Sequence, residues 1–276
     1  MRSPATSELL DRARALLTES GPVESRRGSV PGWLGVDAAE APGIGRFIDH
    51  TLLKPEATRA QVLALCEEAL RYQVKAVCVN GAWVGLCSER LAGSTVLVAG
   101  VVGFPLGAME SAAKASETRL AVAAGAGEVD MVLALGPAKA GEWENVADDI
   151  RCVVAAAGGS SVKVILETAT LEPLEIAAAC LVSGDAGAAF VKTSTGFHSA
   201  GGATLEAVSL MRRAVGPALG VKASGGIRTG EAALQMLAAG ASRIGTSNTA
   251  AMAKWLGGEA GKVGDLLSAQ WVASGK

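Results

Sequence analysis

The chain has 276 residues, of which 50% are hydrophobic, and its mean hydropathy is +0.34. This composition provides enough apolar material for one sizeable core and is not that of a disordered chain. A formal charge of −2 and an aromatic content of 4% argue against the basic, base-stacking surface of a nucleic-acid-binding protein, so we expect no nucleic-acid partner.

Signals for a membrane or an oxidising compartment are weak in this sequence. The longest uncharged stretch, from Ser94 to Met109, contains Gly and Pro and is shorter than the roughly 20 apolar residues of a membrane-spanning helix. The N-terminus has no basic region followed by an apolar core, and the five cysteines are an odd number with no CxxC spacing. We therefore expect no membrane segment, reduced thiols and a cytoplasmic protein.

The N-terminal region differs in pattern from the rest of the chain. Leucine and alanine recur at helical spacing over residues 7–20, behind Ser7 as a capping residue, which predicts an amphipathic helix. Residues 21–43 are rich in Gly, Pro, Ser and acidic side chains, as in a surface connection or a partly ordered extension. We therefore divide the chain into an N-terminal region, residues 1–43, and a main domain, residues 44–276.

From residue 46 onward, short β-type runs alternate with helical segments. Such alternation predicts a parallel sheet covered by helices, and eight strands in one domain predict a closed (β/α)8 TIM barrel with the N-terminal helix as an addition. A doubly wound sheet is the alternative, but its first strand is usually followed by a Gly-rich turn, whereas "LLKPEAT" follows here. The predicted strands are 46–51, 75–80, 95–102, 128–135, 162–168, 189–195, 219–224 and 243–247, and the predicted helices include 58–72, 110–124, 171–183, 203–214 and 229–239.

Two of the predicted strands carry a lysine near their ends. Lys192 lies in "FVKTSTGF" (190–197) and Lys222 in "GVKASGGI" (220–227), while Asp130 lies in the strand "EVDMV". Because alternate side chains of a strand point to opposite faces, the three can meet inside the barrel near its C-terminal mouth, where barrel enzymes place their chemistry. The alternative is that each lysine ends its strand and extends into solvent, which explains two lysines in adjacent units less well than one.

A lysine side chain is a nucleophile only as the free amine, and its ordinary pKa of about 10.4 leaves little amine at neutral pH. Burial and a second positive charge both disfavour the ammonium form, which is how Schiff-base lysines are activated. Lys222 would supply that second charge to Lys192, and Asp130 would transfer protons or orient water.

Three further residues are candidates for a supporting role. Lys163 shares a strand face with Glu167, and an inward-facing Lys163 can pair with Asp130 or Glu167; a purely structural ion pair is the alternative. Asp49 and Thr51 end the first strand in "FIDHT", where a structural cap is the competing interpretation.

Small residues follow the last three predicted strands, in "STG" (194–196), "SGG" (224–226) and "GTSN" (245–248). In barrels, the loops after strands seven and eight commonly bind phosphate, and glycine lets backbone N–H groups approach an anion. A helix starting at Ser247 or Asn248 would direct its positive end to the same place. Each glycine pair taken alone is more often a simple turn. The candidate phosphate-binding residues are Gly196, Gly225, Gly226, Ser247 and Asn248.

Metal and cofactor motifs are not evident. The two histidines, His50 and His198, are far apart in sequence, the cysteines are scattered, and there is no G-x-S-x-G motif. We expect no metal and no cofactor, and we expect His198 to be a loop residue.

Eight segments, in this order, resemble the signature segments of the deoxyribose-phosphate aldolase family, class I aldolases on a (β/α)8 barrel. The resemblance covers about residues 46 to 256. The segments are "DHTLLKPEAT", "VVGFPLG", "EVDMVLALG", "VKVILETA", "FVKTSTGF", "GGAT", "VKASGGIRT" and "GASRIGTS".

The resemblance implies reversible, metal-free cleavage of 2-deoxy-D-ribose 5-phosphate into acetaldehyde and D-glyceraldehyde 3-phosphate. It places the Schiff base on Lys192, proton transfer on Lys222 and Asp130, and the phosphate on the glycine-containing loops named above. It implies sugar phosphates and aldehydes as small-molecule partners, and a homodimer, since dimers are common in the family. Some members carry a lysine after the STG, where this chain has Phe197, so backbone amides would carry more of the phosphate binding.

The tail "WVASGK" also lacks the tyrosine with which some members end. Two other functions remain open from the sequence. One is a class I aldolase for another sugar phosphate, and the other is a noncatalytic sugar-phosphate-binding barrel.

Overall fold

The computed structural model describes residues 43–255 together with residues 11, 13 and 15. These three residues are helical, in agreement with the predicted helix over residues 7–20, and Ala13 is fully buried. The rest of the N-terminal region and residues 256–276 lie outside the described residues. None of the helices in the described part of the chain is long and apolar enough to cross a bilayer.

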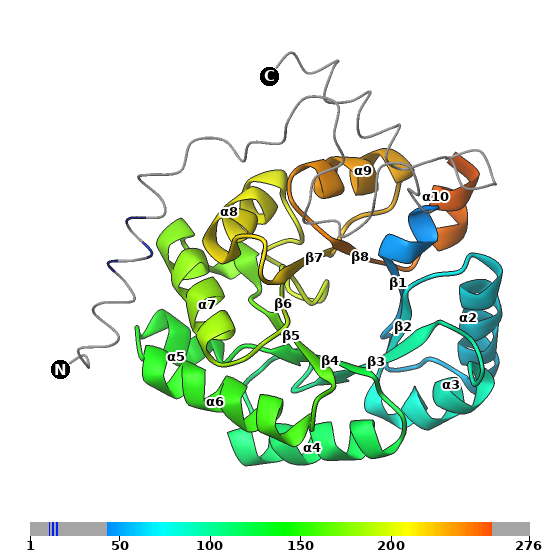
Figure 1. The fold of residues 1–276 in the computed structure, drawn as a ribbon, viewed down its shortest axis with the longest axis horizontal. Coiled ribbons are helices and arrows are strands. Elements are labelled where there is room, and N and C mark those ends of the chain that lie inside the picture. The colour runs from blue at the N-terminus through cyan, green and yellow to red at the C-terminus, as the bar shows by residue number, and fades with distance from the viewer. Residues whose placement is uncertain (1–10, 12, 14, 16–42, 256–276) are drawn as a thin grey trace.

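Eight parallel strands form a closed barrel in which each strand pairs with its neighbours in sequence, and β8 pairs with β1 (Figure 1). This topology confirms the predicted (β/α)8 barrel and excludes the doubly wound sheet. The strands are β1 (Ile48–Leu52), β2 (Ala76–Val79), β3 (Leu97–Val102), β4 (Glu128–Val132), β5 (Ser161–Ile165), β6 (Phe190–Lys192), β7 (Gly220–Ser224) and β8 (Arg243–Thr246).

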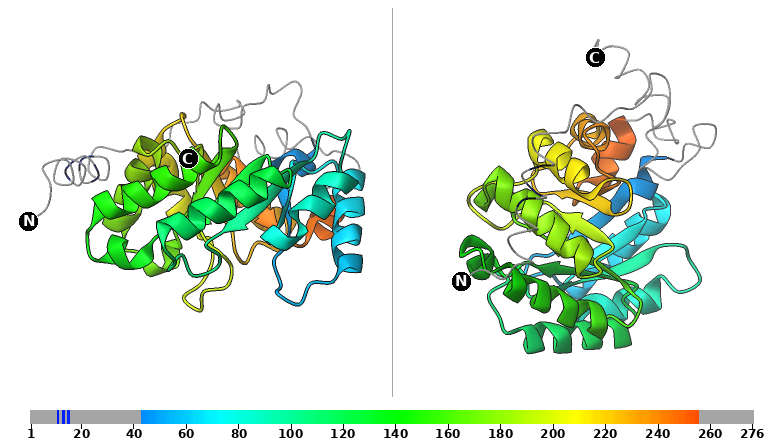
Figure 2. Two further views of the ribbon diagram at one scale, coloured as in Figure 1. Left: turned by 90° about the horizontal axis from the view of Figure 1, so that it is seen from below. Right: turned by 60° about the vertical axis from the view of Figure 1, so that its left-hand side comes forward.

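Helices cover the outside of the strands, as the two further views in Figure 2 show. Five of them lie within one or two residues of the predicted ranges, α10 is the helix expected after the eighth strand, and the structure adds α3, α5 and α6. The α-helices are α2 (Arg59–Arg71), α3 (Val84–Arg90), α4 (Ser111–Ala123), α5 (Leu135–Lys139), α6 (Trp143–Ala156), α7 (Pro173–Asp185), α8 (Leu205–Val215), α9 (Gly230–Ala238) and α10 (Thr249–Trp255), and the 3-10 helices are η3 (Ile44–Phe47), η4 (Gly81–Trp83) and η5 (Thr168–Thr170).

Threonine caps fix where several helices begin. Before α2, Thr58 and Gln61 form a capping box: the Gln61 amide donates to the Thr58 hydroxyl, and the Thr58 amide donates to the Gln61 side chain. Thr204 and Thr229 cap α8 and α9 in the same way through their side-chain oxygens. These caps are why the predicted starts of the three helices agree closely with the structure.

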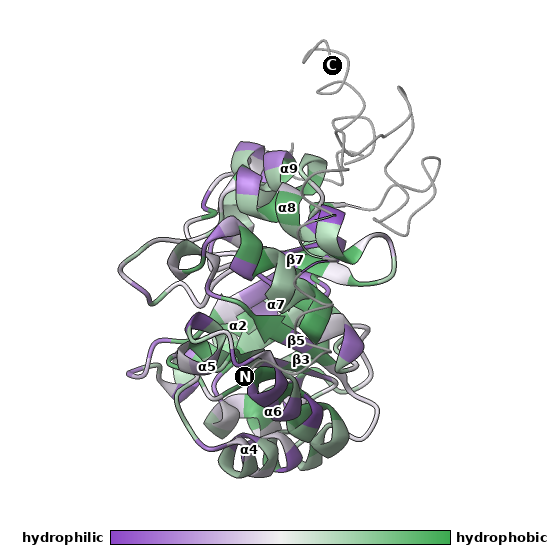
Figure 3. Ribbon diagram, turned by 90° about the vertical axis from the view of Figure 1, so that its left-hand side faces the viewer, coloured by the Kyte–Doolittle hydropathy of each residue, from purple (hydrophilic) through white to green (hydrophobic). Residues whose placement is uncertain are grey.

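The main hydrophobic core lies between the strands and the helices, and hydrophobic residues, green in Figure 3, lie around β3 and β5. Inside the barrel the side chains are of two kinds. The β2 and β3 side holds a small apolar cluster that includes Cys78, Ala99 and Val101. The other strands direct charged side chains inward, so the barrel interior has one apolar wall and one charged wall.

Outside the barrel, a buried ion pair joins two helices. Lys114 of α4 is fully buried, and its Nζ donates to Asp149 Oδ2 of α6 at 2.6 Å and to the carbonyl oxygen of Val132 at 3.0 Å. Ser111 Oγ donates to the other carboxylate oxygen at 2.7 Å. The pair therefore connects both helices to the end of β4.

We expect Asp149→Ala to lower the free energy of unfolding by about 3–5 kcal/mol, because it leaves the buried Lys114 ammonium without its counter-charge. Urea denaturation measures this change. The control is Asp148→Ala, which breaks the exposed pair with Arg151 on the same helix and should cost about 1 kcal/mol or less. Equal losses for the two variants would contradict the stabilising role of the buried pair.

Candidate active site

Seven charged side chains meet inside the barrel, and every one of them is at most 6% exposed. They come from alternate positions of their strands, since alternate side chains share a face. We call this group the charged cluster. Its members are Asp49 of β1, Glu128 and Asp130 of β4, Lys163 of β5, Lys192 of β6, Lys222 of β7 and Arg243 of β8.

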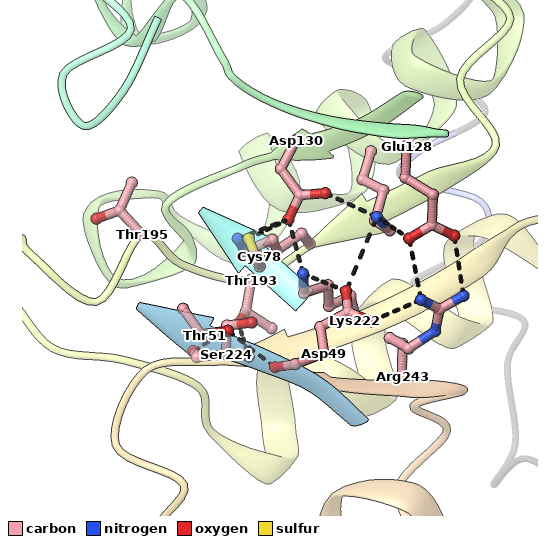
Figure 4. Close-up of polar contacts among 12 residues, drawn as sticks. Asp49, Thr51, Cys78, Glu128, Asp130, Thr193, Thr195, Lys222, Ser224 and Arg243 are labelled. Atoms are coloured by element: carbon pink, nitrogen blue, oxygen red, sulfur yellow. Dashed lines mark hydrogen bonds and ion pairs between the residues drawn. The ribbon is translucent and has the colours of Figure 1, made fainter. Parts of the chain in front are cut away.

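Asp130 is the centre of the charged cluster (Figure 4). Its Oδ1 accepts a hydrogen bond from Lys163 Nζ at 2.8 Å, and its Oδ2 accepts from Lys192 Nζ at 2.9 Å and Lys222 Nζ at 2.7 Å. The strand register explains why the two lysines reach the same carboxylate oxygen, because Lys192 and Lys222 are at paired positions of the neighbouring strands β6 and β7. Sequence reasoning predicted that Asp130, Lys192 and Lys222 would share the barrel interior, and the structure brings them together.

A second layer of ion pairs lies beneath Asp130. Asp49 contacts Lys222 Nζ at 2.5 Å and Arg243 Nη1 at 2.6 Å. Arg243 also forms a fork on Glu128, with Nη1 to Oε2 at 3.1 Å and Nη2 to Oε1 at 3.2 Å, and Glu128 accepts from Lys163 at 2.7 Å. Glu128 and Arg243 were missed by sequence reasoning, although Glu128 lies two residues before Asp130 on the same face.

Two glycines make room for these side chains. A Cβ at Gly220 would collide with the ring of Phe190, which lies 5.3 Å from the Arg243 guanidinium carbon and 5.9 Å from Lys163 Nζ. A Cβ at Gly245 would collide with Ser224 Oγ and lie 3.2 Å from Lys222 Cε. A larger residue at either position would therefore crowd the ring of Phe190 or the side chain of Lys222.

The opposite charges of the cluster shift the pKa values of Asp130 and Lys222. Burial alone would raise the pKa of Asp130, but Lys163, Lys192 and Lys222 outweigh it and hold this pKa well below its usual range. For Lys222, burial alone would lower the pKa, but Asp130 and Asp49 raise it above its ordinary value. At neutral pH the structure therefore has a carboxylate at Asp130 and an ammonium at Lys222.

A cavity of about 380 Å3 opens above the cluster at the C-terminal ends of the strands. Among the described members of the charged cluster, Lys192 alone lines it. The cavity is lined by Thr51, Leu52, Leu53, Lys54, Lys192, Thr195, Gly196, Phe197, Ser224, Gly225, Gly226, Ile227, Arg228, Gly245, Thr246 and Ser247.

Four of the five candidate phosphate-binding residues line this cavity, namely Gly196, Gly225, Gly226 and Ser247. The three glycines have φ values of 82°, 89° and 82°, a left-handed conformation that disfavours other residues.

The fifth candidate and the helix after it differ from the prediction. Asn248 is not among the lining residues, and its amide donates to Thr246 Oγ1 at 3.0 Å. The helix predicted to start at Ser247 or Asn248 begins at Thr249. The expected start was therefore one or two residues too early, because the chain first makes a side-chain-bonded turn at Thr246.

Two cationic residues at the cavity were not singled out from the sequence. Arg228 and Lys54 both line it, Arg228 two residues after the glycine pair 225–226. The sequence "GGIRT" could have indicated Arg228, because the arginine comes two residues after the expected phosphate-binding glycines. The cavity thus has two cationic side chains in its lining besides Lys192.

The supporting candidates also have defined places. Asp49 belongs to the charged cluster, so the alternative of a strand-end cap is wrong for it. Thr51 lines the cavity, and its hydroxyl donates to the Asp49 carbonyl oxygen at 2.8 Å. Of the two partners predicted for Lys163, the structure shows Asp130. The other, Glu167, instead accepts a hydrogen bond from the Thr195 amide at 3.2 Å. His198, as expected, lies in a loop.

The fold and this cavity, with a buried lysine at its base and glycine-containing loops at its rim, are those of a barrel enzyme, and the family match described next shows that its class is that of enzymes that cleave or form carbon–carbon bonds. The chain belongs to the DeoC/LacD family of aldolases, whose family model matches residues 46–260.

Individual relatives agree with this assignment. The deoxyribose-phosphate aldolase of Brevibacillus brevis is 56% identical over 205 residues, which are 74% of this chain and 92% of the relative. A crystal structure from Coccidioides immitis, provisionally assigned as a deoxyribose-phosphate aldolase, has a TM-score of 0.82 at 36% identity and covers 92% of this chain and 98% of its own. The tetrameric deoxyribose phosphate aldolase of Aeropyrum pernix has a TM-score of 0.73 at 32% identity and covers 84% and 97%.

Proposed function

We propose that this aldolase reversibly cleaves 2-deoxy-D-ribose 5-phosphate into acetaldehyde and D-glyceraldehyde 3-phosphate through an imine on Lys192. The observation that carries the proposal is that Lys192 joins the charged cluster to the cavity: its Nζ contacts Asp130 at 2.9 Å, and its side chain lines the space open to a ligand. Relatives that are more than half identical and named for this reaction support the substrate.

The reaction begins when the Lys192 amine attacks the C1 aldehyde of the open-chain sugar. Loss of water gives a protonated imine, which accepts the electron pair of the C2–C3 bond as that bond breaks. The C3 hydroxyl loses its proton to a base, and C3 leaves as the aldehyde carbon of D-glyceraldehyde 3-phosphate. The remaining enamine is protonated at C2, and water hydrolyses the resulting imine to acetaldehyde and free Lys192. The imine serves as the electron sink, so we propose that no metal or cofactor takes part.

Lys222 and Asp130 have separate roles in this scheme. Lys222 keeps its proton, because its pKa is raised by Asp130 and Asp49 against the effect of burial, and so it is a second positive charge beside the nucleophile. Asp130 contacts both lysines through one oxygen, Oδ2, and can pass a proton between them or to a water molecule.

The phosphate group would bind at the rim of the cavity. Backbone amides of Gly196, Gly225 and Gly226, with Ser247 and the neighbouring Asn248, are the proposed anion-binding groups. Arg228 supports this assignment because a guanidinium forms paired hydrogen bonds with phosphate oxygens.

Reductive trapping tests the proposal. Borohydride added with acetaldehyde or with 2-deoxy-D-ribose 5-phosphate should give one covalent adduct, which peptide mass spectrometry locates at Lys192. A panel of sugar phosphates assayed in parallel defines the substrate. A folded protein that binds the sugar phosphate but forms no adduct would instead be a noncatalytic binder. Preference for a longer ketose phosphate would indicate another class I aldolase.

We also propose that the protein is cytoplasmic and forms a homodimer. Its five cysteines are free thiols, which supports a reducing compartment. The tetrameric assembly of the Aeropyrum pernix relative supports self-association in general.

A further inference from the structure

Glu167 is a buried acidic residue that contacts the β6–α8 loop, residues 193–204. It follows β5, is 1% exposed, and accepts hydrogen bonds from the Thr195 amide at 3.2 Å through Oε1 and from the Thr195 hydroxyl at 2.5 Å through Oε2. In the part of the chain that the structure describes, no lysine or arginine forms an ion pair with Glu167. Its carboxyl group thus binds a single residue of the loop, and that residue lines the cavity.

The backbone conformation of Glu167 is unusual for its residue type. Its φ of 55° and ψ of 56° lie in the left-handed region, which is unfavourable for a residue that has a Cβ. Glycine adopts this conformation freely, but glycine has no side chain that could reach Thr195. The conformation therefore points to a role for the side chain at this position.

The Thr195 hydroxyl extends the contact to the residues that follow it. This hydroxyl donates to Glu167 and accepts from the Phe197 amide at 3.1 Å, so the amides of Thr195 and Phe197 both have partners. Gly196 lies between them, and none of the described residues accepts a hydrogen bond from its amide. Because Gly196 lines the cavity, its amide is available to an anion that binds there.

The β6–α8 loop also packs against the glycine pair that follows β7. A Cβ at Gly225 would lie 3.6 Å from the Cα of Gly196 and 3.0 Å from the Cα of Gly202. The Gly225 carbonyl oxygen accepts a hydrogen bond from the Ala203 amide at 3.1 Å. The position of the β6–α8 loop therefore bears on both glycine-containing loops of the cavity.

Lys192 is held in a different way. Its carbonyl oxygen accepts from the Leu166 amide at 2.8 Å, and the Thr193 amide donates to the Lys222 carbonyl oxygen at 3.0 Å. These backbone bonds to the segments on either side of β6 do not involve the Glu167 side chain. A change in that side chain should therefore disturb the β6–α8 loop beyond Thr193 and leave the nucleophile in place.

We propose that Glu167 is a positioning residue that, through Thr195, sets the shape in which the β6–α8 loop binds the phosphate group of the substrate. The inference deepens the proposed function and rests on the assignment of the phosphate to the glycine-containing loops. Glu167 does not line the cavity, so it acts on the ligand through Thr195, which does. Its effect should fall on binding of the anionic end of the substrate and not on imine formation.

The test compares phosphate affinity with imine formation in Thr195→Val, which removes the hydroxyl, and Glu167→Met, which removes both acceptor oxygens. Calorimetric titration with inorganic phosphate should show about threefold weaker binding for Thr195→Val and about tenfold weaker binding for Glu167→Met, and the KM for 2-deoxy-D-ribose 5-phosphate should rise in parallel. Labelling by acetaldehyde and cyanoborohydride needs no phosphate group. Both this labelling and kcat should stay within about twofold of the parent.

Three further variants separate this role from a general structural one. Thr195→Ser keeps the hydroxyl and should bind phosphate like the parent. The double variant Glu167→Met/Thr195→Val should bind phosphate no more weakly than Glu167→Met, because both changes break the same contact. Glu89→Met, on an exposed position of α3, is the matched control and should leave every readout at the parent level.

Phosphate affinity and labelling that fall together would overturn the proposal and leave Glu167 a structural role, and so would unchanged phosphate binding in both single variants. Losses that multiply in the double variant would show that the two residues act separately. If Glu167→Met does not fold, as thermal unfolding reports, Thr195→Val compared with Thr195→Ser decides the question. Failure of the parent protein to form any adduct would count against the proposed function, whereas the phosphate titration would still test the role of Glu167.

Discussion

Lys192→Ala is expected to lower kcat for cleavage of 2-deoxy-D-ribose 5-phosphate by at least about 10⁴-fold and to abolish borohydride trapping. Without the Lys192 amine no imine forms, and the C2–C3 electron pair has no acceptor. Asp130 keeps the ammonium groups of Lys163 and Lys222, so the site should remain folded. Steady-state cleavage and adduct mass spectrometry measure the two effects.

The matched control for this variant is Lys139→Ala on α5. Lys139 is 47% exposed in its side chain, pairs with Glu175 at 2.8 Å and lies outside the charged cluster, so rate and labelling should remain at the parent level. Thermal unfolding of both variants checks that the barrel is intact. A Lys192→Ala protein that cleaves the sugar phosphate at the parent rate would remove the basis of the proposed mechanism.

Lys222→Leu should lower kcat by about 10²- to 10⁴-fold while the KM for the sugar phosphate changes little. Leucine occupies part of the lysine's volume but removes both a positive charge beside Lys192 and a proton donor at Asp130 Oδ2. Steady-state kinetics give kcat and KM, and competitive inhibition by inorganic phosphate reports on the anion-binding loops separately.

The control for this second variant is Arg228→Met, at the rim of the cavity. If Arg228 holds the phosphate, its loss should raise KM and weaken inhibition by inorganic phosphate more than it lowers kcat. The reverse assignment would follow if Lys222→Leu mainly weakened phosphate inhibition with kcat preserved, because Lys222 would then bind the anion. The crowding of Lys222 against Gly245 makes a larger replacement such as arginine unsuitable.

Strand alternation allowed much of this site to be predicted from the sequence. In both apolar runs, the lysine lies at a position whose side chain points to the opposite face from its two neighbours. Because β6 and β7 are consecutive parallel strands, Lys192 and Lys222 lie side by side. The predicted strands 128–135 and 189–195 were too long: in the first the hydrophobic run continues past the end of β4 at Val132, and in the second β6 ends at Lys192, before the β-branched and small polar residues 193–195. After Lys192, the Thr193 amide still donates to the Lys222 carbonyl oxygen at 3.0 Å, but the Thr195 amide donates to the Glu167 side chain at 3.2 Å.

Long-range partners were the part that the sequence did not reveal. Arg243 and Asp49 lie 194 residues apart and meet only because β8 closes onto β1. Arg243 begins its strand, where an arginine is usually exposed to solvent, and periodicity gives no sign that it enters the barrel. The pairing of Lys163 with Glu128 likewise depends on register between β4 and β5, which local pattern does not specify.

The two unlike walls of the barrel interior bear on the course of the reaction. Ala99 and Val101 offer no acid or base, and the Cys78 thiol keeps its proton because burial raises its pKa. The buried ion pairs next to Lys192 thus lie on one side of the barrel interior, the side of Lys222 and Asp130. Proton transfer to the carbon of an enamine on Lys192 would then come from the charged wall of the barrel, while the apolar wall of β2 and β3 takes no part in it.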